Sequence, residues 1–237
     1  MGAEGAEAWG RLADRATEAL DLFWDERLDC FQDLLAGPKG CPAHMARPDG
    51  LLRPNQLFLV SLGLVRGVRA KAAVTAVRRF LLVPGALRSL APLPAPVPLT
   101  IRGGSGQLLN DPVNPYWGRY EGDEDTRRKP AYHNGTAWVW LLPSFCEALA
   151  MAWDFQPSAV AAARACLGSL DGLLASGCVG QLPELLDGDA PHAQRGCDAQ
   201  AWSVTEGLRV WLMLNTMEDH PPANPRNPHA RRSASAL

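Results

Sequence analysis

Apolar residues recur at three- and four-residue spacing through most of this chain, and no long stretch alternates apolar with polar residues. Such spacing is typical of amphipathic helices. It predicts helices over residues 8–24, from 53, over 69–82, from about 134, from 157 to about 174, and over 199–217. We expect Pro143 to kink or split the fourth helix and Gly177 to end the fifth. The expected class is all-α, and a sheet-based fold is disfavoured.

Two long segments, residues 83–133 and 178–198, interrupt the helical pattern and carry most of the polar chemistry. The first is rich in proline, and irregular segments of this length in a compact domain are normally functional or disordered. Its aromatic and charged second half favours function. Each segment follows a pair of helices joined by a short loop and leads into the next helix. We therefore expect both segments to lie at the same end of the helices.

Composition narrows the classes of function. The chain has 237 residues, a net charge of −2 and a pI near 6.2, which argues against a broad nucleic-acid surface. The N-terminus resembles no signal peptide, and Pro143, Ser144 and Glu147 interrupt the longest apolar run, so we expect no membrane span and a cytoplasmic location. We expect one domain over residues 1–218 and a disordered tail over 219–237.

The cysteines and aromatic residues add two expectations. Six cysteines show neither a CxxC pair nor zinc-ligand spacing, so we expect reduced, mostly buried thiols, no metal and no cofactor. Eight tryptophans against three tyrosines suit the stacking of sugar rings, although a large core also uses tryptophan.

The densest polar cluster lies between Gln181 and Trp202. It contains Glu184, Asp187, Asp189, His192 and Arg195. A structural loop needs glycine and proline, but it does not need three carboxylates, an imidazole and a guanidinium. A solvated acidic loop is the alternative. A second cluster of the same character, from Gly118 to Trp140, favours function.

Five runs resemble the C-terminal glucosidase domain of glycogen debranching enzymes, the amylo-α-1,6-glucosidase family. They are RPNQLF (53–58, with Asn55), GALRSLAP (85–92), NPYWGRYEGD (114–123), AYHNGTAWVWLL (131–142) and GQLPELLDGDAPHAQRGCDAQAWSVTE (180–206). The resemblance implies an (α/α)₆ toroid, of which this chain would form roughly the C-terminal half, with long functional loops. It also implies inverting hydrolysis of α-1,6-linked glucose in glycogen or limit dextrin. Val139 and the run 127–130 depart from the family pattern.

The resemblance also assigns roles to residues. Glu184 matches the general base. Asp187, Asp189, His192 and Arg195 would bind sugar hydroxyls or orient their loop, and Arg119 and Asp123 would contact glucose. Trp138 would stack on the glucose ring. For Arg119, Asp123 and Trp138, the alternative is a loop salt bridge or core packing. The remaining substrate-binding positions in the matching runs are Arg88, His133, Asn134 and Trp202.

Inverting hydrolysis needs a second carboxylate as general acid. The resemblance places it upstream of the first matching run, so we expect it to be absent here and the chain alone to be inactive. Glucose release by the chain alone would point to Glu121 or Asp123 as acid, and Glu206 is the next candidate for base.

Two other functions remain open. One is a non-catalytic or split half-barrel that binds α-glucan, pairs with a separate N-terminal half, or self-associates. The other is a sugar epimerase of the same architecture, which is disfavoured because the five histidines supply no clear pair of bases.

Overall fold

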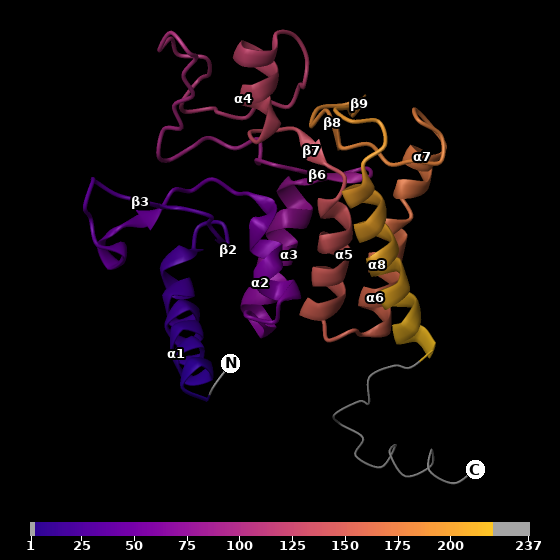
Figure 1. Ribbon diagram of the computed structural model, residues 1–237, viewed down its shortest axis with the longest axis horizontal. Coiled ribbons are helices and arrows are strands. Elements are labelled where there is room, and N and C mark those ends of the chain that lie inside the picture. Colours follow the sequence, from indigo (N-terminus) through magenta and orange to yellow (C-terminus); the bar gives the residue numbers. More distant parts are fainter. Residues whose placement is uncertain (1–2, 220–237) are drawn as a thin grey trace.

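The computed structural model describes residues 3–219, which form a layer of helices capped at one end by a small sheet and long loops (Figure 1). The α-helices are α1 (Ala3–Ala19), α2 (Leu57–Ser61), α3 (Gly67–Phe80), α4 (Lys129–Tyr132), α5 (Leu141–Ala152), α6 (Pro157–Leu167), α7 (Leu170–Leu174) and α8 (Ala201–Asp219). Short 3₁₀ turns are η1 (Leu20–Phe23), η2 (Ala43–Met45) and η3 (Pro54–Gln56), and η4 (Glu124–Arg128) is a π-helical turn. The predicted tail lies, apart from Asp219, outside the described residues.

The strands are short. They are β1 (Trp24–Asp25), β2 (Cys30–Phe31), β3 (Leu35–Ala36), β4 (Arg47–Pro48), β5 (Leu82–Val83), β6 (Ala86–Arg88), β7 (Ala137–Trp138), β8 (Leu185–Leu186) and β9 (Gln194–Arg195). The last five form one antiparallel sheet in sequence order, with Leu87 opposite Trp138 and Ala137 opposite Leu186.

The chain is broadly helical as predicted, but the short strands form a five-stranded sheet that the expected all-α class does not include. Strands of two or three residues are too short to show the alternation that identifies a strand in a sequence. In β8 both residues, Leu185 and Leu186, are apolar and buried, so this strand shows no alternation either. The half-toroid stays a prediction.

Three local predictions need correction. The helix expected from about residue 134 begins at Leu141, because β7 occupies 137–138. Pro143 lies in the first turn of α5, where its missing N–H breaks no helical hydrogen bond, so the helix runs unbroken to Ala152. The helix expected from 157 to about 174 is divided into α6 and α7 at Gly168 and Ser169, and Gly177 lies beyond the end of α7, whose C-cap is Ala175.

Helix α5 is the centre of the core. It packs against α2, α3, α6 and α8, and Leu142, Phe145, Cys146 and Ala150 on it are fully or almost fully buried. A helix enclosed on all sides is apolar all round, and this explains its sequence, LLPSFCEALAMA. Among the described helices, none combines the length and hydropathy needed to cross a bilayer.

The expectation of mostly buried thiols holds in part. All six cysteines are free, but only Cys30 and Cys146 are buried, whereas Cys178 and Cys197 are exposed.

The two long polar segments meet at the sheet end of the helices, as predicted (Figure 1). Gly188 donates its N–H to the carbonyl of Gly118 at 2.6 Å, and the N–H of Tyr120 donates to Asp187 Oδ1 at 2.8 Å. A Cβ on Gly188 would collide with the carbonyl of Gly135. Glycine is therefore required where the loops touch.

Candidate functional site

Glu184 is held by both of its carboxylate oxygens. It immediately precedes β8, and its backbone N–H donates to the carbonyl of Cys197 at 2.8 Å. The hydroxyl of Tyr132 donates to Oε1, and the N–H of Cys197 donates to Oε2 at 2.9 Å. Gly196 packs directly against the carboxylate, where a Cβ would collide with Oε2. The half-buried carboxylate therefore has a fixed orientation.

Tyr132 is set in a cluster of aromatic rings. Its ring centroid lies 4.6 Å from Trp138, 4.8 Å from His133 and 5.6 Å from Tyr120. The indole N–H of Trp138 donates to the carbonyl of Tyr132 at 3.0 Å. Burial, followed by the hydrogen bond to Glu184, raises the pKa of Tyr132 far above its usual value. The phenol therefore remains protonated and can donate to the carboxylate.

Trp138 and His133 support this cluster from one side. Their rings stack at 5.4 Å with an interplanar angle of 5°. Trp138, the predicted stacking face for glucose, is only 8% exposed, whereas His133 is exposed to solvent. Burial and the charge of Arg53 lower the pKa of His133, which favours its neutral form.

Asp187 is a fully buried carboxylate that joins the two long loops. Its Oδ1 accepts from the N–H of Tyr120 at 2.8 Å, and its Oδ2 accepts from Arg195 Nε and Nη2 at 3.1 and 2.9 Å. Arg119 Nη1 lies 4.0 Å away, and Nη2 of the same side chain donates to the carbonyl of Ala190. A buried charge needs such partners, and losing one is costly. Asp187 is placed to orient the loops.

Asp189, two residues on, lies in a different environment. The hydroxyl of Tyr116 donates to its Oδ1 at 2.9 Å, and Arg119 Nε lies 3.7 Å from its Oδ2. Burial and Asp189 raise the pKa of Tyr116 to about 12. Arg88 Nε donates to the carbonyl of Gly188 at 2.9 Å, which fixes the turn between the two aspartates. Asp189 and Arg119 each keep 42% of their side-chain surface exposed, enough to meet a ligand.

Three other predicted site residues are committed to the protein itself. Asp123 caps η4 by accepting hydrogen bonds from backbone N–H groups of its first turn. The amide of Asn134 accepts from Arg53 Nη2 at 2.9 Å and donates to the carbonyl of Pro130 at 2.8 Å. His192 has a φ of 61°, and its Nδ1 lies 3.0 Å from the carbonyl of Asp187. These contacts shape the loops.

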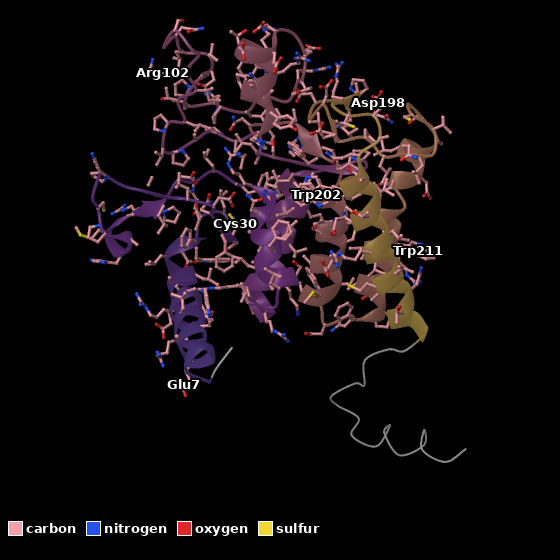
Figure 2. All side chains as sticks on the ribbon, viewed as in Figure 1. Glu7, Cys30, Arg102, Asp198, Trp202 and Trp211 are labelled. Atoms are coloured by element: carbon pink, nitrogen blue, oxygen red, sulfur yellow. The ribbon has the colours of Figure 1, made fainter. Side chains whose placement is uncertain are left out.

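Trp202 offers an open aromatic face. It is 50% exposed at the start of α8, and Figure 2 shows it near the sheet end of the molecule. Its other face stacks on Trp140 at 3.8 Å and 17°, and Trp140 stacks in turn on Phe58 at 6.0 Å. The stack fixes the exposed indole as a rigid platform.

Sequence reasoning missed several residues that hold this site together. Tyr132 stands beside the predicted His133, so its place in the same run was a usable signal. Tyr116 and Tyr120 lie within another predicted run, NPYWGRYEGD. The N–H of Cys197 could not be found from the sequence, because every residue except proline carries a backbone donor.

Glu206, the alternative base, and Glu121, an alternative acid, both lie in ion pairs. Glu206 Oε2 is 2.9 Å from Arg209 Nη2, which also lies 2.7 Å from Glu147 Oε2. Glu121 Oε2 is 3.5 Å from Arg195 Nη2 and is exposed. Among the residues that the structure describes, no three or more histidine, cysteine or acidic side chains are placed to hold a metal ion.

Comparison with known families bears on this geometry. Residues 107–209 match the family model described as amylo-alpha-1,6-glucosidase. The match confirms, over this segment, the resemblance to the C-terminal domain of glycogen debranching enzymes. It includes every predicted site residue except Arg88. A search of curated proteins found no match to the chain.

Proposed function

We propose that this chain, whose residues 107–209 match the amylo-alpha-1,6-glucosidase family, hydrolyses α-1,6-linked glucose branch residues of glycogen or a limit dextrin. One observation carries the proposal. Glu184 lies within the matched segment, and its two oxygens are oriented by Tyr132 and by the N–H of Cys197. A carboxylate fixed in this way can act as a base at a defined position, whereas a solvated acidic loop would leave it mobile.

The proposed mechanism is inverting hydrolysis with two carboxylates. Glu184 accepts a proton from water while the water oxygen forms a bond to the anomeric carbon. The bond from that carbon to the glycosidic oxygen breaks, and a general acid gives its proton to this oxygen. Following the family resemblance, we propose that the acid is supplied from outside residues 1–237, by a segment that we call the acid-bearing segment.

The other predicted residues divide by exposure. Trp202 would stack on a sugar ring, and the half-exposed Asp189 and Arg119 would contact hydroxyls. Asp187 and Asn134, whose polar groups are occupied by protein partners, would keep the loops in place. Arg119 contacts hydroxyls before and during the reaction, so its loss would weaken ground-state binding.

Glucose release from a limit dextrin tests the proposal. The chain alone should release no glucose above background, because loss of proton donation removes roughly 10²–10⁴-fold in rate. The chain joined to its acid-bearing segment should be active and should bind isomaltose. An inactive joined enzyme that binds no α-glucan would exclude the proposal. Competent hydrolysis by the chain alone would instead place the acid here, at Glu121 or Asp123.

The second candidate is a half-barrel that pairs with another chain. The observation that favours it is an apolar groove of about 390 Å³ lined by Leu167, Leu170, Leu182, Leu208 and Trp211, among others. The groove lies between α6, α7 and α8 at the edge of the helical layer (Figure 1). If such a half-barrel binds α-glucan but is not catalytic, it would bind isomaltose without hydrolysing it, even when joined to the acid-bearing segment.

A further inference from the structure

Asp33 and Asn55 form a polar pair outside the matched segment. Asp33 follows β2, and Asn55 lies in η3, where the N–H of Phe31 donates to Gln56 Oε1 at 3.1 Å and ties the two elements together. Asn55 Nδ2 donates to Asp33 Oδ2 at 2.5 Å. Both side chains are exposed to solvent. The pair is therefore both positioned and accessible.

The pair has unused hydrogen-bonding capacity. Within residues 3–219, no donor reaches Asp33 Oδ1 or Asn55 Oδ1. Desolvation raises the pKa of Asp33, against the lowering effects of Asn55 and Arg53.

Arg53 connects this pair to the Glu184 site. Its guanidinium donates to the carbonyls of Ser89 and His133 and to Asn134 Oδ1, the last at 2.9 Å. Its charge lowers the pKa of His133 and opposes the raised pKa of Asp33. The run from Arg53 to Asn55 is therefore fixed against the 133–134 turn.

His133 completes the arrangement. Its imidazole is exposed, and neither ring nitrogen makes a hydrogen bond in the part of the chain that the structure describes. The ring lies 4.8 Å from that of Tyr132, whose hydroxyl donates to Glu184. The chain thus joins the Asp33–Asn55 pair through Arg53 to the turn that carries His133, whose ring contacts Tyr132.

We propose that Asp33, Asn55 and His133 form a subsite that binds the hydroxyl groups of an α-glucan beside Glu184. This proposal rests on the proposed function, because it takes the same substrate class. Two adjacent acceptors suit neighbouring hydroxyls of a pyranose, each of which donates one hydrogen bond. The imidazole can donate or accept according to its tautomer.

The test is isomaltose binding to the full chain, measured by calorimetry. Asp33→Asn should weaken binding about tenfold or more, because a hydrogen bond to a charged group is lost. Asp29→Asn is the matched control, since Asp29 is an exposed aspartate just before β2 and the substitution is the same. It should leave the affinity unchanged. Asn55→Ser serves as the second variant if Asp33→Asn unfolds.

Monodeoxy analogues of isomaltose separate direct contact from a structural role. The analogue that lacks the contacted hydroxyl should bind the wild type more weakly than isomaltose does. Asp33→Asn should bind that analogue and isomaltose equally well. Equal losses for every analogue on both proteins would overturn the subsite, as would unchanged affinity of Asp33→Asn for isomaltose. If the wild type binds no isomaltose even when joined to its acid-bearing segment, the proposed function fails and the subsite fails with it.

Discussion

At the scale of single residues, the site separates side chains that position others from those free to meet a ligand. Asp187 is fully buried and fully paired, whereas Asp189 keeps 42% of its side-chain surface exposed. Glu184 lies between these extremes, half-buried with both oxygens oriented. The chemistry that we assign to Glu184 therefore depends on contacts that fix its carboxylate without covering it.

Glu184→Gln should lower kcat by about 10²–10⁴-fold in the enzyme joined to its acid-bearing segment. The amide keeps the shape of the carboxylate, but it cannot accept a proton from water. Isomaltose affinity, measured on the same variant, should stay near the wild-type value, because a loss confined to kcat reflects an interaction made in the transition state.

Glu206→Gln is the control for this experiment. Its carboxylate is bound by Arg209 on the same helix, so kcat should not change. If Glu184→Gln retains most of its kcat while Glu206→Gln does not, then the base is Glu206.

Alkaline pH should destabilise the fold through Tyr116. Burial and Asp189 raise its pKa from 10.0 to about 12, so the folded state retains a proton that the unfolded state loses first. This stabilisation is fully present below pH 10.0 and is lost as the pH rises through about 12. Urea unfolding across this range should show the free energy of unfolding falling with pH.

Tyr116→Phe should reduce that fall, because phenylalanine has no proton to lose. Tyr132, whose pKa is also raised, should supply part of the remaining dependence. An identical pH profile for Tyr116→Phe and the wild type would contradict the assignment.

At the scale of elements, the pairing of β7 with β8 and of β8 with β9 assembles the site. These strands place Glu184 beside the segment 131–138 on one side and beside Cys197 on the other. Gly196 follows β9, has a φ of 71° and packs against the Glu184 carboxylate. Glycine is needed here for two reasons, backbone conformation and space.

Gly196→Ala should therefore lower the free energy of unfolding by about 1–3 kcal/mol and also weaken catalysis. The new methyl group would displace the Glu184 carboxylate as well as strain the backbone. Gly180→Ala separates these effects, because Gly180 has a φ of 82° but nothing lies within 4 Å of its Cβ position. Equal losses of kcat in both variants would show that contact with Glu184 is unimportant.

At the scale of the whole molecule, the helical layer has apolar surface at both edges. On α1, Trp9 and Leu12 are 66% and 51% exposed, and on α8, Leu208, Trp211 and Leu212 are 56%, 54% and 51% exposed. Figure 2 shows Trp211 at the outer side of α8. Exposed apolar surface of this extent favours association, which agrees with the proposed pairing.

The purified chain should therefore dimerise or aggregate unless a partner half is present. Sedimentation velocity should show a concentration-dependent mass, and Trp211→Gln should shift it toward the monomer. Val179→Gln is the control, because Val179 is 75% exposed but lies outside both helices. A wild-type chain that stays monomeric and unfolds cooperatively would rule out this expectation.

The sequence alone predicted several of the helices and the location of the polar chemistry. Repeated apolar spacing identified α3 and α8 to within about two residues at each end. Side chains three and four residues apart lie on one face of a helix, so the buried face is visible in the local sequence. Two polar segments between helices also identified the loops that meet at the sheet end. Both signals are local, so they are readable before the chain folds.

The arrangement of those loops depends instead on contacts between residues far apart in the chain. Asp187 and Asp189 look equivalent in the sequence, yet pairing with Arg195 and Tyr120 buries the first and leaves the second half-exposed. Tyr132 and Glu184 are 52 positions apart and meet because two-residue strands pair across that distance. No local pattern encodes such contacts, since they depend on which backbones approach one another after the helices have packed.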